Sequence, residues 1–102
     1  MDTNEVILIT HADTDTGYTI ARELLAAGHR VAVTARNPGS LSRILLGQKA
    51  DRVIAVAADI DDAAQRAGIL RRAHARFGLP VTRVIDGRDS HQIRPSALQM
   101  AS

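Results

Sequence analysis

Short apolar segments recur along the chain. Residues 6–10, 30–35 and 52–57 are nearly continuous apolar runs in which Val, Ile and Ala dominate. Runs of this length without polar alternation are typical of strands that are covered on both faces of a sheet. A fourth run, residues 81–85, includes Thr82 and Arg83 and is more polar. The pattern therefore predicts four strands, of which the last is the least buried.

Segments with helical periodicity separate these runs. Residues 18–27 repeat their apolar positions at helical spacing, at Ile20, Ala21, Leu24 and Leu25. Gly28 follows, at a position where helices commonly end. Residues 37–40 are typical of a turn that leads into a helix cap. A second apolar stripe comes after them, at Leu41, Ile44 and Leu45. Residues 6–28 and residues 30–45 are therefore each predicted to form a strand, a turn and a helix.

A third helix is predicted after the third strand. Asp59, Asp61 and Asp62 supply capping and first-turn acids, which favour a helix N-terminus. The apolar face of this helix is expected to comprise Ala63, Ala67, Leu70, His74 and Phe77. Residues 78–80 contain Gly and Pro and end the helix.

Alternating strands and helices predict an α/β fold. Strands that alternate with helices of about this length are joined by right-handed crossovers, which gives parallel strands with helices on the faces of the sheet. Residues 1–86 would form this domain, and residues 87–102 a polar tail that is loosely ordered or contacts a partner. Ending the sheet at the fourth strand exposes an edge, so homo-oligomerisation through that edge is also expected.

Composition narrows the possible functions. A chain of 102 residues with 45% hydrophobic residues supports one domain. The absence of cysteine excludes disulfides and thiolate zinc sites. The net charge is +2, the arginines are interspersed with acids, and aromatic residues make up 2%, so nucleic-acid binding is not expected. No apolar run is long enough to cross a membrane and no signal peptide is evident, so a cytoplasmic location is expected.

The order of elements resembles the coenzyme-binding end of the short-chain dehydrogenase/reductase family. The resemblance covers about residues 5–86 and includes the first strand–helix–strand unit, Asp59-Ile60 after the third strand, and Arg76-Phe77-Gly78 before the fourth. It implies a three-layer Rossmann-like half-domain, in which four parallel strands lie in the order 3-2-1-4 with helices on both faces. It also implies a site for a nicotinamide dinucleotide at the carboxyl ends of the strands. Thr10, Gly17, Arg36, Asp59 and Ile60 would belong to that site.

The first turn departs from the family pattern. The resemblance implies three glycines after Thr10, which let the backbone approach the pyrophosphate, but only Gly17 is retained. His11 and Asp15 stand at the other two positions. A carboxylate of Asp13 or Asp15 could occupy the helix N-terminus in place of a phosphate, or Asp15 or Thr16 could be a simple N-cap. His11 could donate to a phosphate or could be only a polar turn residue.

Arg36 bears on the choice of coenzyme. Members of the family that prefer NADP often carry a basic residue at this position, while Ala35 stands where NAD-preferring members have Asp. The resemblance therefore implies NADP(H), if a dinucleotide binds at all. Arg36 could equally be a solvated arginine at a strand end, and Asp59 a loop or capping acid.

The acids at the strand ends allow two other readings. The rim that they form comprises Asp13, Asp15, Asp59, Asp61 and Asp62. One or two carboxylates of this rim could hold Mg²⁺ together with waters, or Asp59 could be the acceptor of a phospho-receiver domain. The acids could also be only capping residues of two helices. The receiver reading lacks the Lys that such domains use on a later strand. The histidines are not at metal-ligand spacing, so no metal site is predicted.

The catalytic part of the family pattern is missing from these residues. The Asn-Asn-Ala-Gly motif is replaced by residues 85–88, and the catalytic Ser and the Tyr with Lys four residues on are expected beyond position 102. Tyr18 has Arg22 at that spacing but belongs to the first helix. We therefore expect a coenzyme-binding module of an oxidoreductase that is inactive alone. A non-enzymatic assembly or regulatory protein and a truncated gene product are the alternatives.

Overall fold

A computed structural model describes residues 5–88 of the chain. Its strands are β1 (Val6–Thr10), β2 (Arg30–Ala35), β3 (Val53–Ala57) and β4 (Arg83–Asp86). All neighbouring strands are parallel, and their order is β3-β2-β1-β4. The predicted α/β class, strand direction and strand order are confirmed. Gly87 and Arg88 form a turn after β4, while the rest of the predicted tail lies outside the described residues.

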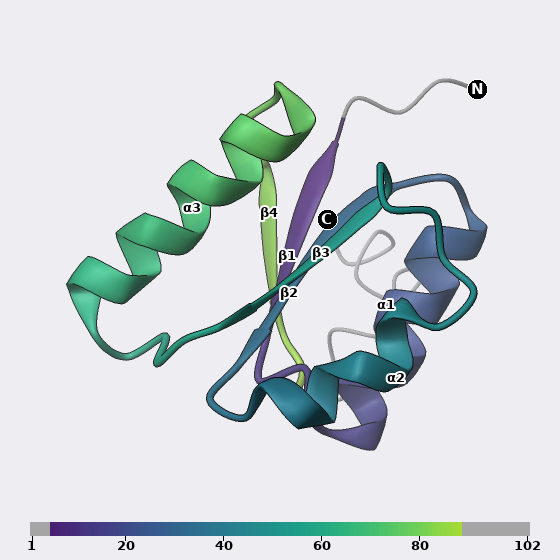
Figure 1. Cartoon of the computed structure of the whole chain (residues 1–102), viewed down its shortest axis with the longest axis horizontal. Coiled ribbons are helices and arrows are strands. Elements are labelled where there is room, and N and C mark those ends of the chain that lie inside the picture. The colour runs from purple at the N-terminus through teal and green to yellow at the C-terminus, as the bar shows by residue number, and fades with distance from the viewer. Residues whose placement is uncertain (1–4, 89–102) are drawn as a thin grey trace, which may run out of the picture.

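Helices cover both faces of the sheet (Figure 1). Helix α1 (Asp15–Ala26) and the short helix α2 (Ser42–Leu45), which a 3-10 turn η1 (Pro38–Leu41) precedes, lie on one face. Helix α3 (Ala63–Phe77) lies on the other. Gly28 and Gly78 follow α1 and α3 with positive φ angles of 94° and 72°, which glycine adopts without strain. These are the predicted helix ends.

Two apolar clusters hold the layers together. One joins β1 and β2 to α1 and α2 through residues such as Ile7, Ile20 and Ile44. The other joins the opposite face of the sheet to α3 through residues such as Leu8 and Ile69. Burial of both faces explains why the first two strands are apolar at almost every position.

The predicted apolar face of α3 is wrong. Ile69 and Ala73 are the buried residues of this helix, whereas Ala63, Ala67, Leu70 and His74 are exposed and Phe77 is partly buried. The stripe that faces the sheet is displaced by one residue, which rotates it by about 100° around the helix. Within residues 5–88 no helix is long and apolar enough to cross a bilayer.

Candidate functional site

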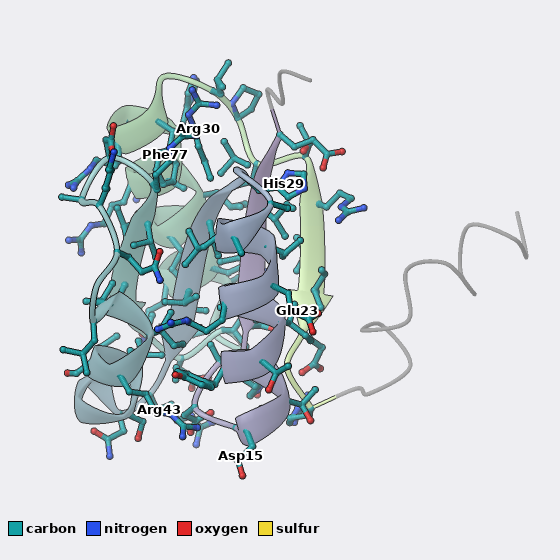
Figure 2. All side chains as sticks on the ribbon, turned by 90° about the vertical axis from the view of Figure 1, so that its right-hand side faces the viewer. Asp15, Glu23, His29, Arg30, Arg43 and Phe77 are labelled. Atoms are coloured by element: carbon teal, nitrogen blue, oxygen red, sulfur yellow. The ribbon has the colours of Figure 1, made fainter. Side chains whose placement is uncertain are left out.

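The carboxyl ends of the four parallel strands meet at one end of the molecule. Figure 2 shows Asp15 and Arg43 at this end, opposite Arg30 and Phe77. Here Thr10 ends β1, Arg36 follows β2, and Asp59 lies two residues after β3. The sequence predicted that these three residues would share one edge of the sheet, and the structure places them there. In a doubly wound fold, ligands bind along this edge.

The turn from β1 to α1 is tightly built. His11 has φ = +51°, a left-handed conformation that is unusual for a residue with a side chain. The N–H of Ala12 donates to the carbonyl of Thr34 at 3.0 Å, which ties the turn to β2. Gly17 lies against the turn, since a Cβ there would be 2.7 Å from Cα of Ala12. The retained glycine thus allows α1 to pack closely against the end of β1.

Thr14 caps α1, which corrects the predicted N-cap at Asp15 or Thr16. Its Oγ1 accepts a hydrogen bond from the N–H of Gly17 at 2.9 Å. The side chain of Asp15 is 97% exposed and forms an ion pair with Arg43 at 2.9 Å. Asp13 is exposed as well. Neither carboxylate therefore substitutes for a phosphate at the first turn, where the N–H groups of Asp15 and Thr16 have no intrahelical acceptor.

Gly87 closes the site on the β4 side. Its N–H donates to the carbonyl of Thr10 at 2.6 Å, and its carbonyl accepts from Oγ1 of Thr14 at 2.8 Å. A Cβ on Gly87 would lie 2.5 Å from the carbonyl oxygen of His11 and 3.1 Å from Cα of Gly17. Only glycine fits this contact between β4 and the first turn.

Asp86 contacts both the first turn, through His11, and Arg88, which lies two residues after β4. Its Oδ1 lies 3.2 Å from Nδ1 of His11, and its carboxylate accepts hydrogen bonds from the backbone N–H, Nε and Nη2 of Arg88. The hydrogen bonds from the Arg88 side chain are the main reason why the pKa of Asp86 falls from 3.8 to about 2. Partial desolvation opposes this shift, and the Arg88 N–H and the charges of His11 and Arg88 add to it.

Arg36 meets two acids from the loop after β3. Its Nη2 lies 3.4 Å from Oδ1 of Asp59 and 3.9 Å from Oδ2 of Asp61. The Arg36 side chain is 74% exposed, so both ion pairs are solvated and weak. Asp59 also accepts from the N–H of Asp61 at 3.0 Å, while its own N–H donates to Oε1 of Gln65. Asp59 therefore orders this loop, and Arg36 is free to exchange partners.

Two hollows flank Arg36. A groove of about 230 Å³ is lined by His11, Asp13, Ala35, Arg36, Asp61 and Arg88. A pocket of about 20 Å³ lies between the ends of β2 and β3 and includes Ile60 in its lining. Of the predicted site residues, His11 and Arg36 line both hollows, and Asp13, Asp59 and Ile60 each line one. Thr10, Asp15 and Gly17 line neither of the two.

Carboxylates outnumber guanidinium groups at this edge. The acids of the edge are Asp13, Asp15, Asp59, Asp61, Asp62 and Asp86. The arginines whose side chains contact residues of this edge are Arg36, Arg43, Arg66 and Arg88. Among residues 5–88 no three His, Asp or Glu side chains lie close enough to hold a metal ion. The charge balance disfavours a polyanionic ligand unless specific donors compensate for it.

A family model described as short chain dehydrogenase matches residues 5–85. The chain belongs to the short-chain dehydrogenase family. No curated protein sequence matches the chain significantly.

Solved structures of this family match the fold. One is a 3-ketoacyl-(acyl-carrier-protein) reductase from Brucella melitensis complexed with NADH, with 29% identity and a TM-score of 0.67 over 74% of this chain and 31% of that one. Another is a short-chain dehydrogenase from Streptomyces avermitilis, with 28% identity and a TM-score of 0.70 over 82% of this chain and 30% of that one. A third is a Caenorhabditis elegans family member with cofactor, with 26% identity and a TM-score of 0.68 over 74% and 30%. The chain thus spans about a third of these structures.

The site fits a short-chain dehydrogenase coenzyme in part. Arg36 and the two hollows beside it suit the adenosine end, and the α1 N-terminus keeps the donors that a phosphate needs. His11 and Asp15 add side chains where the family uses glycine. The left-handed φ of His11 shows that this backbone position retains the conformation glycine would provide.

Sequence reasoning missed Thr14, Gly87 and the Asp86–Arg88 pair. The contacts of Thr14 and Asp86 across to the opposite segment, Thr14 to Gly87 and His11 to Asp86, join residues more than 70 positions apart, whereas the Asp86–Arg88 pair is local. Thr14 did carry a local signal, since Thr three residues before Gly17 is a common N-cap arrangement. Tyr18 has the structural role that the sequence predicted for it. Arg43 and Arg22 lie over its ring, 4.4 and 5.7 Å from the ring centre.

Proposed function

We propose that this chain is the coenzyme-binding part of a short-chain dehydrogenase-like oxidoreductase, that it prefers NADP(H), and that it binds it weakly. The placement of Arg36 carries the proposal. This guanidinium follows β2 at the mouth of both hollows and is held only by solvated ion pairs, so a 2′-phosphate can replace Asp59 and Asp61 as its partner. Neighbours described as complexed with NADH or with cofactor support a nicotinamide coenzyme.

The same site accounts for weak binding. His11 follows β1 and its side chain lines the groove, where glycine would leave more space for a pyrophosphate. Asp15 places a carboxylate at the first position of α1. This carboxylate is 97% exposed and paired with Arg43, so water screens its repulsion of a pyrophosphate and its effect on binding is modest. His11 and Arg88 can offset part of this repulsion, because both line the groove.

We further propose that these 102 residues do not transfer hydride alone. They contain one tyrosine, Tyr18, which is followed four positions later by Arg22 rather than Lys. A nicotinamide coenzyme supplies the hydride when it is bound. The residues around the hollows can bind and orient a dinucleotide, but no described side chain is placed as a proton donor beside a substrate.

Titration calorimetry with the full chain tests the coenzyme proposal. NADPH should bind more tightly than NADH, and Arg36→Ala should remove the difference. Arg71→Ala, which removes an exposed arginine from α3, is the matched control and should leave both affinities unchanged. The double variant His11→Gly/Asp15→Gly should bind NADPH at least tenfold more tightly, because two obstacles to the pyrophosphate are removed. No binding to the folded protein at millimolar NADPH would reject the proposal.

A non-enzymatic assembly function is the second candidate. It is favoured by β4, an edge strand in which Val84 is 57% exposed. Pairing of two β4 edges would give a homodimer. Light scattering at rising protein concentration tests this candidate with Val84→Lys as the variant. A folded wild-type monomer at high concentration would exclude it.

A further inference from the structure

A second groove lies at the opposite edge of the sheet, along β3. Its volume is about 400 Å³, larger than either hollow of the coenzyme edge. Most of β3 lines it, together with residues from the α2–β3 segment and from α3. Figure 1 shows β3 running between α2 on one side and α3 on the other. The groove is thus a trough with a strand edge as its floor and a wall on each side.

The floor of the trough presents backbone hydrogen-bonding groups. Ala58 donates its N–H to the carbonyl of Ala35 on β2, and the carbonyl of Arg52 accepts from Val31. Because successive residues of a strand direct their backbone groups to opposite sides, Val53, Ala55 and Ala57 direct theirs away from β2. No other strand pairs with this side of β3 among the described residues. The floor of the trough therefore offers the alternating backbone donors and acceptors with which a further strand could pair.

The two walls differ in chemistry. On the α2 side the lining residues are uncharged, with Leu45 and Ala50 among them. On the α3 side they are Arg72 and Arg76. Nη2 of Arg76 donates to the carbonyl of Ala50, while Arg72 is exposed and no acid pairs with it among residues 5–88. One wall therefore suits apolar side chains and the other suits carboxylates.

We infer that the β3 edge binds an extended peptide of a partner protein in which apolar and acidic residues alternate. A peptide strand sends alternate side chains to opposite faces, so its apolar residues would meet Leu45 and Ala50 while its acids meet the arginines. Arg72 can receive an acid directly, while Arg76 must exchange the carbonyl of Ala50 for one. Arg72 and Arg76 are one helical turn apart, a rise of about 6 Å. Acids at alternate positions of a strand are about 6.6 Å apart, which matches this spacing.

The charges argue against a second copy of the chain as the occupant. If two β3 edges paired in an antiparallel continuous sheet, the two α3 helices would lie on the same face. Arg72 and Arg76 of both copies would then gather there with no acid of α3 to offset them, since this helix contains none. An acidic peptide satisfies the same backbone groups and neutralises the arginines.

Fluorescence anisotropy with the full chain and a labelled octapeptide of alternating valine and glutamate tests the inference. The peptide should bind, and a peptide with lysine in place of glutamate should not. Arg72→Glu should weaken glutamate-peptide binding by about tenfold or more and allow the lysine peptide to bind. Arg71→Glu makes the same charge change one residue away, outside the groove, and should have little effect.

A second measurement tests whether the peptide pairs with the backbone of β3. Hydrogen exchange at the amides of Val53, Ala55 and Ala57 should slow when the peptide binds. Ala55→Pro removes one outward N–H without removing a β2 hydrogen bond, and should abolish binding while urea unfolding shows a folded protein. Failure of the glutamate peptide to bind at millimolar concentration, or equal binding to the Arg72→Glu variant, would overturn the inference. Self-association that Ala55→Pro abolishes would overturn it in favour of a second copy.

Discussion

Thr14 links three segments that the coenzyme edge depends on, and replacing it with alanine is the most informative perturbation of this edge. Its Oγ1 accepts from the N–H of Gly17 at 2.9 Å and donates to the carbonyl of Gly87 at 2.8 Å, with the carbonyl of His11 at 3.3 Å as a second acceptor. Thr14→Ala removes the helix cap and the tie between β4 and the first turn together.

The magnitude follows from these two interactions. Loss of a threonine N-cap costs about 1 kcal/mol. Loss of the hydrogen bond to Gly87 costs about 1 kcal/mol more, because the carbonyl is partly buried. The free energy of unfolding should therefore fall by about 2 kcal/mol, a factor of about 30 in the folding equilibrium. With a urea m-value of about 1.5 kcal/mol/M, the midpoint should fall by about 1.3 M.

Urea unfolding followed by circular dichroism measures this change, and two further variants separate its parts. Thr14→Ser keeps both hydrogen bonds and should stay within about 0.5 kcal/mol of the wild type. Thr14→Asp keeps the cap acceptor but cannot donate to Gly87 when ionised, so it should fall between the serine and alanine variants. The reasoning is refuted if Thr14→Ala changes the unfolding free energy by less than about 0.5 kcal/mol, or if serine is as damaging as alanine.

Three further predictions concern the same fold. Gly87→Ala should destabilise the protein by about 1–3 kcal/mol, because the new Cβ overlaps the carbonyl of His11, and a normal urea midpoint would contradict this. Gly68→Ala should stabilise by about 0.5–1 kcal/mol, since its Cβ would meet only a side-chain atom of Arg71 at 3.7 Å; a lower melting temperature would count against it. The pKa of Asp86 is about 2 in the folded protein and has its ordinary value of 3.8 in the unfolded chain. The ionised carboxylate therefore adds to the free energy of unfolding above pH 4, and this contribution is lost as the pH falls through 2. Solvent around Arg88 limits this to about 1 kcal/mol or less, and Asp86→Asn should flatten the stability profile between pH 4 and 2.

The fold could be predicted from the sequence because its signals are local and repeated. The strands that became β1 and β2 are apolar at almost every position, since both of their faces are covered, and helical segments alternate with them. Right-handed crossovers between parallel strands then leave few possible strand orders. The bounds of β1 and β2, the glycines that follow α1 and α3, and the order β3-β2-β1-β4 all agree with this reasoning.

The face of α3 could not be predicted with the same success. Ile69 and Leu70 are adjacent, and alanines occur on several sides of this helix, so its apolar periodicity fits more than one face. The sheet selects Ile69 and Ala73 because it can bury only one stripe. Leu70 is left 39% exposed.

By itself, the sequence determined the fold class, the family and the edge of the sheet at which the candidate residues meet. Strand ends and helix starts are local properties, and parallel strands bring them to one edge. Only the tertiary structure decided how that edge is built. The hydrogen bond from Thr14 to the carbonyl of Gly87, the contact that excludes a side chain at Gly87 and the approach of Asp86 to His11 all join the end of β4 to the first turn. Contacts between segments so far apart in the chain leave no pattern within either segment, so three-dimensional packing alone reveals them.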